Sequence, residues 1–124
     1  MIYFIGAGPG AADLITVKGK ELLEKADLVI YAGSLVNPEL LKYCKPECTI
    51  MNSATMTLEE VIAAMVPAAQ AGQLVVRLHT GDPSVYGAHR EQIDLLRSYN
   101  LDYEVVPGVI SLCAAAACLK AEYT

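Results

Sequence analysis

Three short segments of the sequence combine glycine and proline with polar side chains. They are residues 6–10 (Gly-Ala-Gly-Pro-Gly), residues 80–87 (Thr-Gly-Asp-Pro-Ser-Val-Tyr-Gly) and residues 107–111 (Pro-Gly-Val-Ile-Ser). Glycine lets a backbone come close to a ligand, and proline limits the entropy that a loop loses on binding. Each segment alone is also typical of an ordinary turn. Together they indicate a ligand site, provided that the fold brings them to one place.

The elements around these segments alternate between two kinds. Short apolar runs at residues 2–5, 27–31, 48–51, 74–79 and 102–106 predict five strands, and helix-length patterns lie between them and after residue 110. Parallel strands need crossover helices, so this alternation predicts an α/β fold with a mostly parallel five-stranded sheet and helices on both faces. Ligands bind such sheets outside the carboxyl ends of the strands, where all three segments fall.

Local signals place several helix boundaries. Thr16 is the expected N-cap of a helix over residues 14–26, in which Gly19 indicates a close backbone approach. Asn37-Pro38 starts a short helix over residues 39–43. Thr57 and Glu60 have the spacing of a capping box, and the helix that follows should kink at Pro67 and end at Gly72.

Composition excludes several classes of function. The chain has 124 residues, enough for one domain, and a formal net charge of −5. A binder of nucleic acid or of an anionic membrane would show a basic face instead. The longest uncharged stretches, residues 61–76 and 105–119, are interrupted by proline and glycine and are too short to span a bilayer. The first residues lack the pattern of a secretion signal, so a cytoplasmic location is expected.

The cysteines do not predict a metal site. Cys44 and Cys48 are spaced C-x3-C, and Cys113 and Cys118 are spaced C-x4-C, whereas structural zinc sites favour C-x2-C. Disulfides are not expected without a secretory context. We interpret all four as ordinary thiols.

The first glycine segment nominally fits a dinucleotide fingerprint. Gly6, Gly8 and Ala11 match G-x-G-x-x-G/A, but that motif requires an acid about 20 residues on for the ribose. Residues 31–34 (Tyr-Ala-Gly-Ser) contain no carboxylate, and Pro9-Gly10 interrupts the turn. A stand-alone Rossmann-like nucleotide-binding module without catalysis is therefore the alternative hypothesis.

The ordered motifs resemble those of a known family. Residues 5–10 with 13–16, residues 81–83 with 86–87, and residues 106–109 before an alanine-rich helix resemble the tetrapyrrole (corrin/porphyrin) methylases. Within that family, residues 31–36, 56–60 and 79–88 look most like the precorrin-4 and cobalt-precorrin-4 C11-methyltransferases. The resemblance implies methyl transfer from S-adenosylmethionine to ring carbon C11 of such a corrin precursor in cobalamin biosynthesis.

The resemblance also implies an organisation. Residues 1–124 would be the N-terminal α/β domain of a two-domain enzyme that forms a homodimer, with S-adenosylmethionine bound between the domains. The chain ends without a cap or a polar tail, which favours a second domain beyond it. This chain alone should then have little or no methyltransferase activity.

Site residues follow from the resemblance at matching positions. The expected cofactor-binding residues are Thr80, Gly81, Asp82, Val85, Ile110 and Ser111, and the expected substrate-binding residues are Pro9 and Tyr86. No catalytic residue is assigned. Structural alternatives remain for several of them: Asp82 and Ser111 as helix caps, Pro9 as a rigid turn and Tyr86 as a core residue. Many relatives have Gly-Asp-Pro in the first loop, where this chain has Ala11 after Gly10.

Three cationic side chains lie near the second segment: Arg77, His79 and Arg90. A corrin precursor carries many carboxylates, which arginine binds well through its planar guanidinium, and a histidine could accept a proton after methylation. The alternatives are a hydrogen-bonded structural His79 and a solvated Arg90.

Overall fold

The computed structural model describes residues 1–33, 36–79, 89–109 and 117. These residues form one sheet of five strands: β1 (Ile2–Gly6), β2 (Leu28–Tyr31), β3 (Thr49–Asn52), β4 (Val75–His79) and β5 (Tyr103–Val106). The strands lie in the order β3-β2-β4-β1-β5, and every neighbouring pair is parallel. The predicted parallel α/β sheet is confirmed.

Three α-helices are described, namely α1 (Val17–Lys25), α2 (Leu58–Gln70) and α4 (His89–Ser98). Short 3-10 helices also occur: η1 (Ala12–Leu14), η3 (Pro38–Tyr43) and η4 (Ser53–Thr55). The helix expected over residues 14–26 therefore begins later, at Val17, and the short helix expected at residues 39–43 is a 3-10 helix. Of the helix expected after residue 110, only Ala117 lies in the described part.

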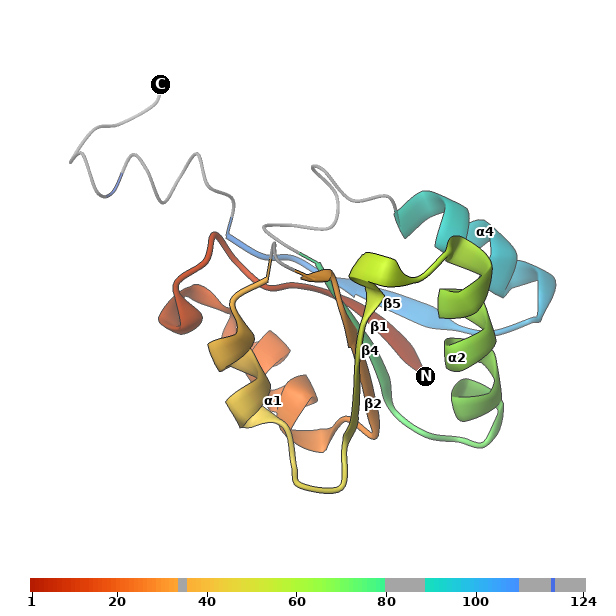
Figure 1. Cartoon of the computed structure of the whole chain (residues 1–124), viewed down its shortest axis with the longest axis horizontal. Helices are drawn as coiled ribbons and strands as arrows, with labels where there is room; N and C mark the ends of the chain where they lie inside the picture. The colour runs from red at the N-terminus through yellow and green to blue at the C-terminus, as the bar shows by residue number, and fades with distance from the viewer. Residues whose placement is uncertain (34–35, 80–88, 110–116, 118–124) are drawn as a thin grey trace.

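The helices form two layers around the sheet (Figure 1), with α1 and η3 on one face and α2 and α4 on the other. The chain moves outward from β1 through β2 to β3, and then returns through β4 to β5. Parallel crossovers are almost always right-handed, so connections that run in opposite directions along a sheet must lie on opposite faces. The sheet is covered on both sides for this reason.

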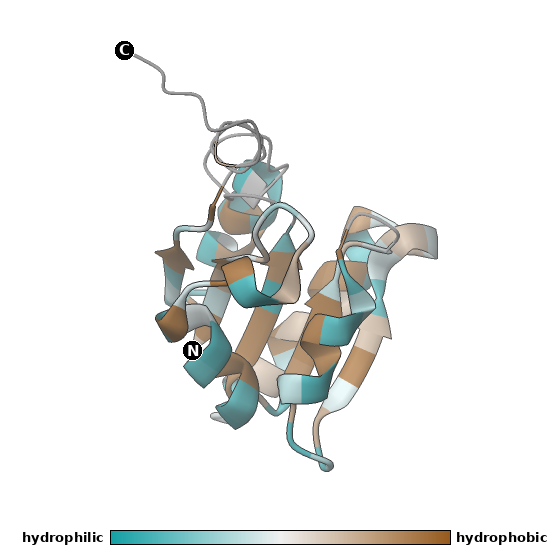
Figure 2. Cartoon of the chain, turned by 90° about the vertical axis from the view of Figure 1, so that its left-hand side faces the viewer, coloured by the Kyte–Doolittle hydropathy of each residue, from teal (hydrophilic) through white to brown (hydrophobic). Residues whose placement is uncertain are grey.

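Both faces of the sheet are hydrophobic, as expected for buried parallel strands. Successive strand residues alternate between two cores, and in Figure 2 the strands are largely apolar while the helices carry both kinds of residue. The core toward α2 and α4 contains Ile2, Phe4, Leu28, Ile30, Val61, Ile62, Met65, Val66, Val75, Ile93 and Leu96. The core toward α1 and η3 contains Ile5, Ala7, Leu23, Ala26, Val29, Val36, Leu40, Val76, Leu78 and Val106.

The predicted helix caps are present. The Thr16 side chain accepts a hydrogen bond from the Gly19 backbone N–H at 3.1 Å, and Thr57 and Glu60 form the reciprocal capping box. A Cβ at Gly19 would lie 3.1 Å from a methyl carbon of Ile5, which confirms the close approach of α1 to β1. Helix α2 runs through Pro67 as far as Gln70, so the kink expected there stays a prediction.

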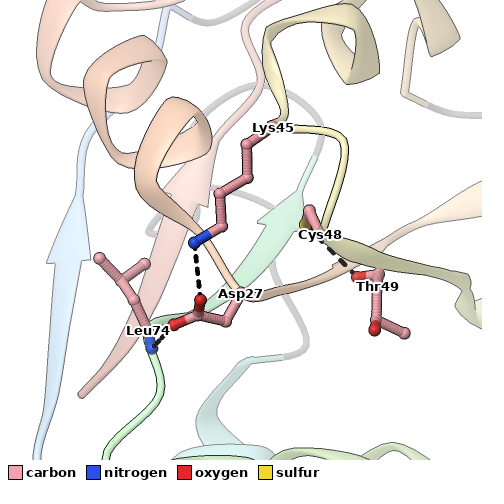
Figure 3. Close-up of polar contacts among 5 residues, drawn as sticks. All are labelled: Asp27, Lys45, Cys48, Thr49 and Leu74. Carbon is pink, nitrogen blue, oxygen red and sulfur yellow. Dashed lines mark hydrogen bonds and ion pairs between the residues drawn. The ribbon is translucent and has the colours of Figure 1, made fainter.

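Asp27 connects three strands at the amino edge of the sheet (Figure 3). One carboxylate oxygen accepts from the Leu74 backbone N–H at 2.8 Å and the other from Lys45 Nζ at 2.7 Å. The Asp27 carbonyl also accepts from the Thr49 backbone N–H at 2.9 Å. One residue thereby ties together the starts of β2, β3 and β4, at the edge opposite the ends of β1, β4 and β5.

These contacts predict a pH dependence of stability. The hydrogen bond from Lys45 and that from the Leu74 N–H lower the pKa of Asp27 below its usual 3.8, because both favour the ionised carboxylate. The resulting stabilisation is complete above that usual value and is lost as pH falls through the lowered folded-state pKa. Asp27→Asn should therefore lower the urea midpoint at pH 7, and by less at pH 3. Asp94→Asn, at an exposed position on α4, is the control. If Asp27→Asn lowered the urea midpoint equally at pH 7 and pH 3, the prediction would be contradicted.

Within the part of the chain that the structure describes, none of the helices has the length and apolar character needed to cross a membrane.

Candidate functional site

The three glycine-containing segments follow three neighbouring strands. β1 lies between β4 and β5, Gly6 is in register with His79, and Ile5 is in register with Val106. The three strands therefore end within about one residue of the same level at one edge of the sheet. The Ala7 backbone N–H donates to the His79 carbonyl at 2.6 Å, which holds the start of the first segment against the end of β4.

The connections that leave this edge diverge. The chain after β1 leads to α1 on one face, whereas α4, which follows β4, lies on the other face. Open α/β sheets bind ligands in the crevice where neighbouring connections part in this way. The junction of β1 and β4 is therefore the candidate site.

The backbone of the first segment is compact on one side and open on the other. Gly8 has φ +84°, and a Cβ there would lie 2.8 Å from the Leu14 carbonyl oxygen, so this loop is packed tightly against the chain that leads into α1. Gly10 has φ +126°, and a Cβ there would meet nothing within 4 Å. Pro9 is half-buried between them. The loop thus offers exposed backbone beside a fixed proline ring.

Asn37 holds this loop from a distant part of the chain. Its Nδ2 donates to the Gly10 carbonyl at 2.7 Å, while its Oδ1 accepts from the Glu39 N–H at 3.0 Å as the N-cap of η3. The sequence indicated the cap but not the contact with Gly10. The signal available was the choice of asparagine at a capping position, because an amide can donate as well as accept, whereas aspartate only accepts.

Asn37→Asp separates the two roles. The carboxylate keeps the cap but cannot donate to Gly10, so the unfolding free energy should change by less than about 1 kcal/mol. The Leu14 N–H donates to the Ala11 carbonyl at 3.1 Å and closes the turn directly after Gly10, so this amide should exchange with solvent about 2–10 times faster once the loop is held less firmly. Hydrogen exchange followed by NMR measures this rate. Asn37→Ala loses both contacts and should cost about 1 kcal/mol more. Unchanged exchange in Asn37→Asp would show that the bond does not hold the loop.

The strand order argues against the dinucleotide-binding alternative. In that fold the acid that binds the ribose follows the strand beside the glycine loop. Here β4 lies between β1 and β2, and the Ala32 N–H at the end of β2 bonds to the Leu78 carbonyl of β4. A side chain after β2 would therefore be two strands, about 10 Å, from the glycine loop. The missing carboxylate and the strand order therefore both argue against a dinucleotide-binding site.

The three cationic residues near the second segment differ in their burial and in their contacts. Arg77 is buried, with Nε donating to Gln92 Oε1 and Nη1 to the Ile30 carbonyl, each at 3.2 Å. Its guanidinium binds protein groups, so the carboxylate-binding interpretation is wrong for Arg77. His79 is also buried, and its ring stacks on that of Phe4 with centroids 6.0 Å apart. Arg90 is exposed on α4, as its solvated alternative predicts.

Of the predicted site residues, the structure describes only Pro9. The cofactor-binding candidates Thr80, Gly81, Asp82, Val85, Ile110 and Ser111 and the substrate-binding candidate Tyr86 lie outside the described residues. What the structure places is the end of β4 before residues 80–88, the start of α4 after them, and the end of β5 followed by Pro107 and Gly108.

The cysteines that can be placed lie away from this edge. Cys44 and Cys48 are half-buried free thiols. Burial, and to a lesser extent the neighbouring Cys48, raises the pKa of Cys44 to about 11. A thiol with such a pKa is protonated at neutral pH and is a poor nucleophile or metal ligand. In the described ranges no three potential ligand side chains come together as a metal site would need. Cys113 and Cys118 fall outside those ranges.

Comparison with known proteins identifies the family. The model of the family "Tetrapyrrole (Corrin/Porphyrin) Methylases" matches residues 1–124. The chain belongs to the tetrapyrrole methylase family. A cobalt-precorrin-4 C(11)-methyltransferase of Methanocaldococcus jannaschii is 58% identical over 99% of this chain, and one of Priestia megaterium is 51% identical over the same share. The chain covers 48% of each, so it spans about half the length of these curated relatives.

Solved structures of tetrapyrrole methylases share the fold. The cobalt precorrin-4 methyltransferase CbiF is 51% identical and superposes with a TM-score of 0.96 over 99% of this chain and 52% of its own. A uroporphyrin-III C-methyl transferase of Thermus thermophilus, solved in complex with S-adenosylhomocysteine, is 36% identical with a TM-score of 0.77. That match covers 93% of this chain and 47% of the other. The family resemblance and the predicted fold are both confirmed.

Proposed function

We propose that this chain forms half of an S-adenosylmethionine-dependent methyltransferase that acts on carbon C11 of precorrin-4 or cobalt-precorrin-4. The observation that carries the proposal is that β4, β1 and β5, the strands that the three family motifs follow in the sequence, are neighbours and end at one edge of the sheet. The relatives that carry this activity in their names are about half identical to the chain or more. Their greater length supports a second domain, which we propose faces this edge.

The described residues at the end of β1 leave room for a ligand. Ala7, Gly8 and Gly10 leave the end of β1 without bulky side chains, and there is open space beside Gly10. When bound, S-adenosylmethionine would supply an electrophilic methyl group on sulfur. The protein's part in such an in-line displacement is to position donor and acceptor and to exclude water.

We assign the remaining roles by motif. Thr80, Gly81, Asp82 and Val85 after β4, with Ile110 and Ser111 after β5, would bind the cofactor, with the Asp82 carboxylate close to its cationic methionine part. Pro9 and Tyr86 would contact the tetrapyrrole. The half-buried Pro9 next to exposed Gly10 supports a rigid surface at that position.

Calorimetric titration with S-adenosylhomocysteine tests the cofactor assignment. The chain should bind this compound saturably and should not bind NAD. Asp82→Ala should weaken binding by about tenfold or more, the effect of losing one charge-assisted contact. Asp94→Ala, at an exposed position on α4, should leave affinity unchanged. Binding of NAD instead, or equal losses in both variants, would contradict the proposal.

The whole reaction needs the rest of the site. Because the chain spans about half of its relatives' length, we expect little or no methylation of a corrin precursor by this chain alone. Appreciable turnover would show that one domain suffices. The homodimer implied by the family stays a prediction, which light scattering of the purified chain would check.

A further inference from the structure

A buried polar pair lies on either side of residues 80–88. Arg77 is on β4, two residues before that strand ends at His79, and Gln92 is in the first turn of α4. Their side chains are 6% and 5% exposed, and Arg77 Nε donates to Gln92 Oε1 at 3.2 Å. Arg77 Nη1 also donates to the Ile30 carbonyl on β2. The pair therefore links the strand before this segment to the helix after it.

The stability of the fold does not by itself explain why the charged guanidinium of Arg77 is buried between β4 and α4. The neighbouring core is apolar, and the partners of Arg77 that the structure describes, an amide and a backbone carbonyl, are neutral. Removing a guanidinium from water is costly, and apolar groups of similar volume often replace a buried charged group without loss of stability. Burial lowers the pKa of Arg77 to about 10, so the cation persists at neutral pH.

The Arg77–Gln92 hydrogen bond can fix the position of α4 along the sheet, which the apolar contacts of this helix cannot do. The helix packs on the sheet through Ile93 and Leu96, and such hydrophobic contacts have no preferred direction. β4 itself is fixed by its ladders to β1 and β2. A hydrogen bond from a charged group depends strongly on angle and distance, so the Arg77–Gln92 bond sets where the first turn of α4 lies along β4.

We infer that Arg77 and Gln92 are positioning residues, which fix the end of β4 and the start of α4, the two elements that flank residues 80–88, relative to each other. The effect on cofactor binding rests on the proposed function, because that segment carries Thr80, Gly81, Asp82 and Val85. The anchoring of α4 does not rest on it, and the two can be measured separately.

Proteolysis without any ligand tests the anchoring. Trypsin cleaves after Arg90, in the first turn of α4, only when that turn opens, and Arg97 at the far end of the helix gives an internal reference. Gln92→Leu should speed cleavage after Arg90, relative to Arg97, by about tenfold, as expected for a lost bond to a charged group. Gln92→Glu, which can still accept from Arg77, should stay within about threefold of the parent chain.

Titration with S-adenosylhomocysteine tests the consequence for binding. Gln92→Leu should weaken affinity by about tenfold, and Gln92→Glu should restore most of it. The double variant R77M/Q92L removes both buried polar side chains, so neither is left unpaired, although the Ile30 carbonyl loses its bond from Arg77. It should therefore have a denaturation midpoint closer to that of the parent than Gln92→Leu has, while still showing both defects. Leu96→Val loosens the same helix without touching the bond and is the matched control.

The outcomes separate the two proposals. If the parent chain binds no S-adenosylhomocysteine, the cofactor assignment fails while the cleavage experiment still decides the anchoring. If Gln92→Leu is cleaved after Arg90 no faster than the parent, or if Leu96→Val shows the same relative increase, the inference is overturned. Faster cleavage with unchanged affinity would overturn its extension to the cofactor segment.

Discussion

Gly8→Ala is expected to destabilise the chain by about 2–4 kcal/mol and to abolish its binding of S-adenosylhomocysteine. Two effects combine at this position. Gly8 has φ +84°, a conformation that alone costs an L-residue about 1–2 kcal/mol. The added Cβ would also lie 2.8 Å from the Leu14 carbonyl oxygen, a backbone atom that cannot turn away as a side chain would. The loop would have to move away from the site.

Gly72→Ala is the matched control for this prediction. Gly72 follows α2 with a nearly equal φ of +81°, but a Cβ there meets nothing within 4 Å. It should cost only the conformational penalty of about 1–2 kcal/mol and leave binding intact. Urea unfolding and calorimetry of both variants measure the comparison, and the difference between them isolates the contact with Leu14. Equal losses of stability would mean that the first loop is not packed as the structure shows.

Phe4→Ala is expected to lower the unfolding free energy by about 3–5 kcal/mol. Phe4 is fully buried on β1, in the core toward α2 and α4. Its ring stacks on His79 at the end of β4 and meets Tyr103 of β5 edge-on, with centroids 6.1 Å apart. Its removal leaves a cavity among the three strands that carry the candidate site, so binding should weaken as well.

Tyr99→Ala supplies the control for an aromatic side chain outside the core. Tyr99 is 50% exposed, and its loss should cost about 1 kcal/mol or less. Both variants can be compared by urea unfolding at pH 7. If Phe4→Ala lowered the unfolding free energy by no more than Tyr99→Ala does, the Phe4 ring would not fill the core as the structure has it.

The local features of the fold could be predicted because their causes are local. Five apolar runs became five strands, each within one or two residues of its expected bounds. Thr16 and the Thr57–Glu60 box cap helices because they satisfy backbone donors within the next turn. The helix expected from residue 14 begins only at Val17, because Ala12–Leu14 closes a 3-10 turn before the Thr16 cap. Periodicity alone does not distinguish such a turn from the first turn of a helix.

The contacts that position the candidate site could not be predicted in the same way. Asn37 holds Gly10, and Arg77 meets Gln92 and the Ile30 carbonyl, across long stretches of chain. Arg77 near the second motif indicated a carboxylate-binding cation, yet the alternation of β4 turns its side chain into the core beside α4. Which face of a strand a residue occupies depends on its register in the sheet, and only tertiary pairing sets that register.

The sequence by itself determined the family, the alternation of strands and helices, and the three motifs at strand ends, since each depends on residue types at short spacing. The tertiary structure alone decided that β4 enters between β2 and β1. That insertion places the end of β4 beside the glycine loop and removes the end of β2 from it. Strand order is set by packing and right-handed crossovers between segments far apart in the chain, which no local pattern encodes.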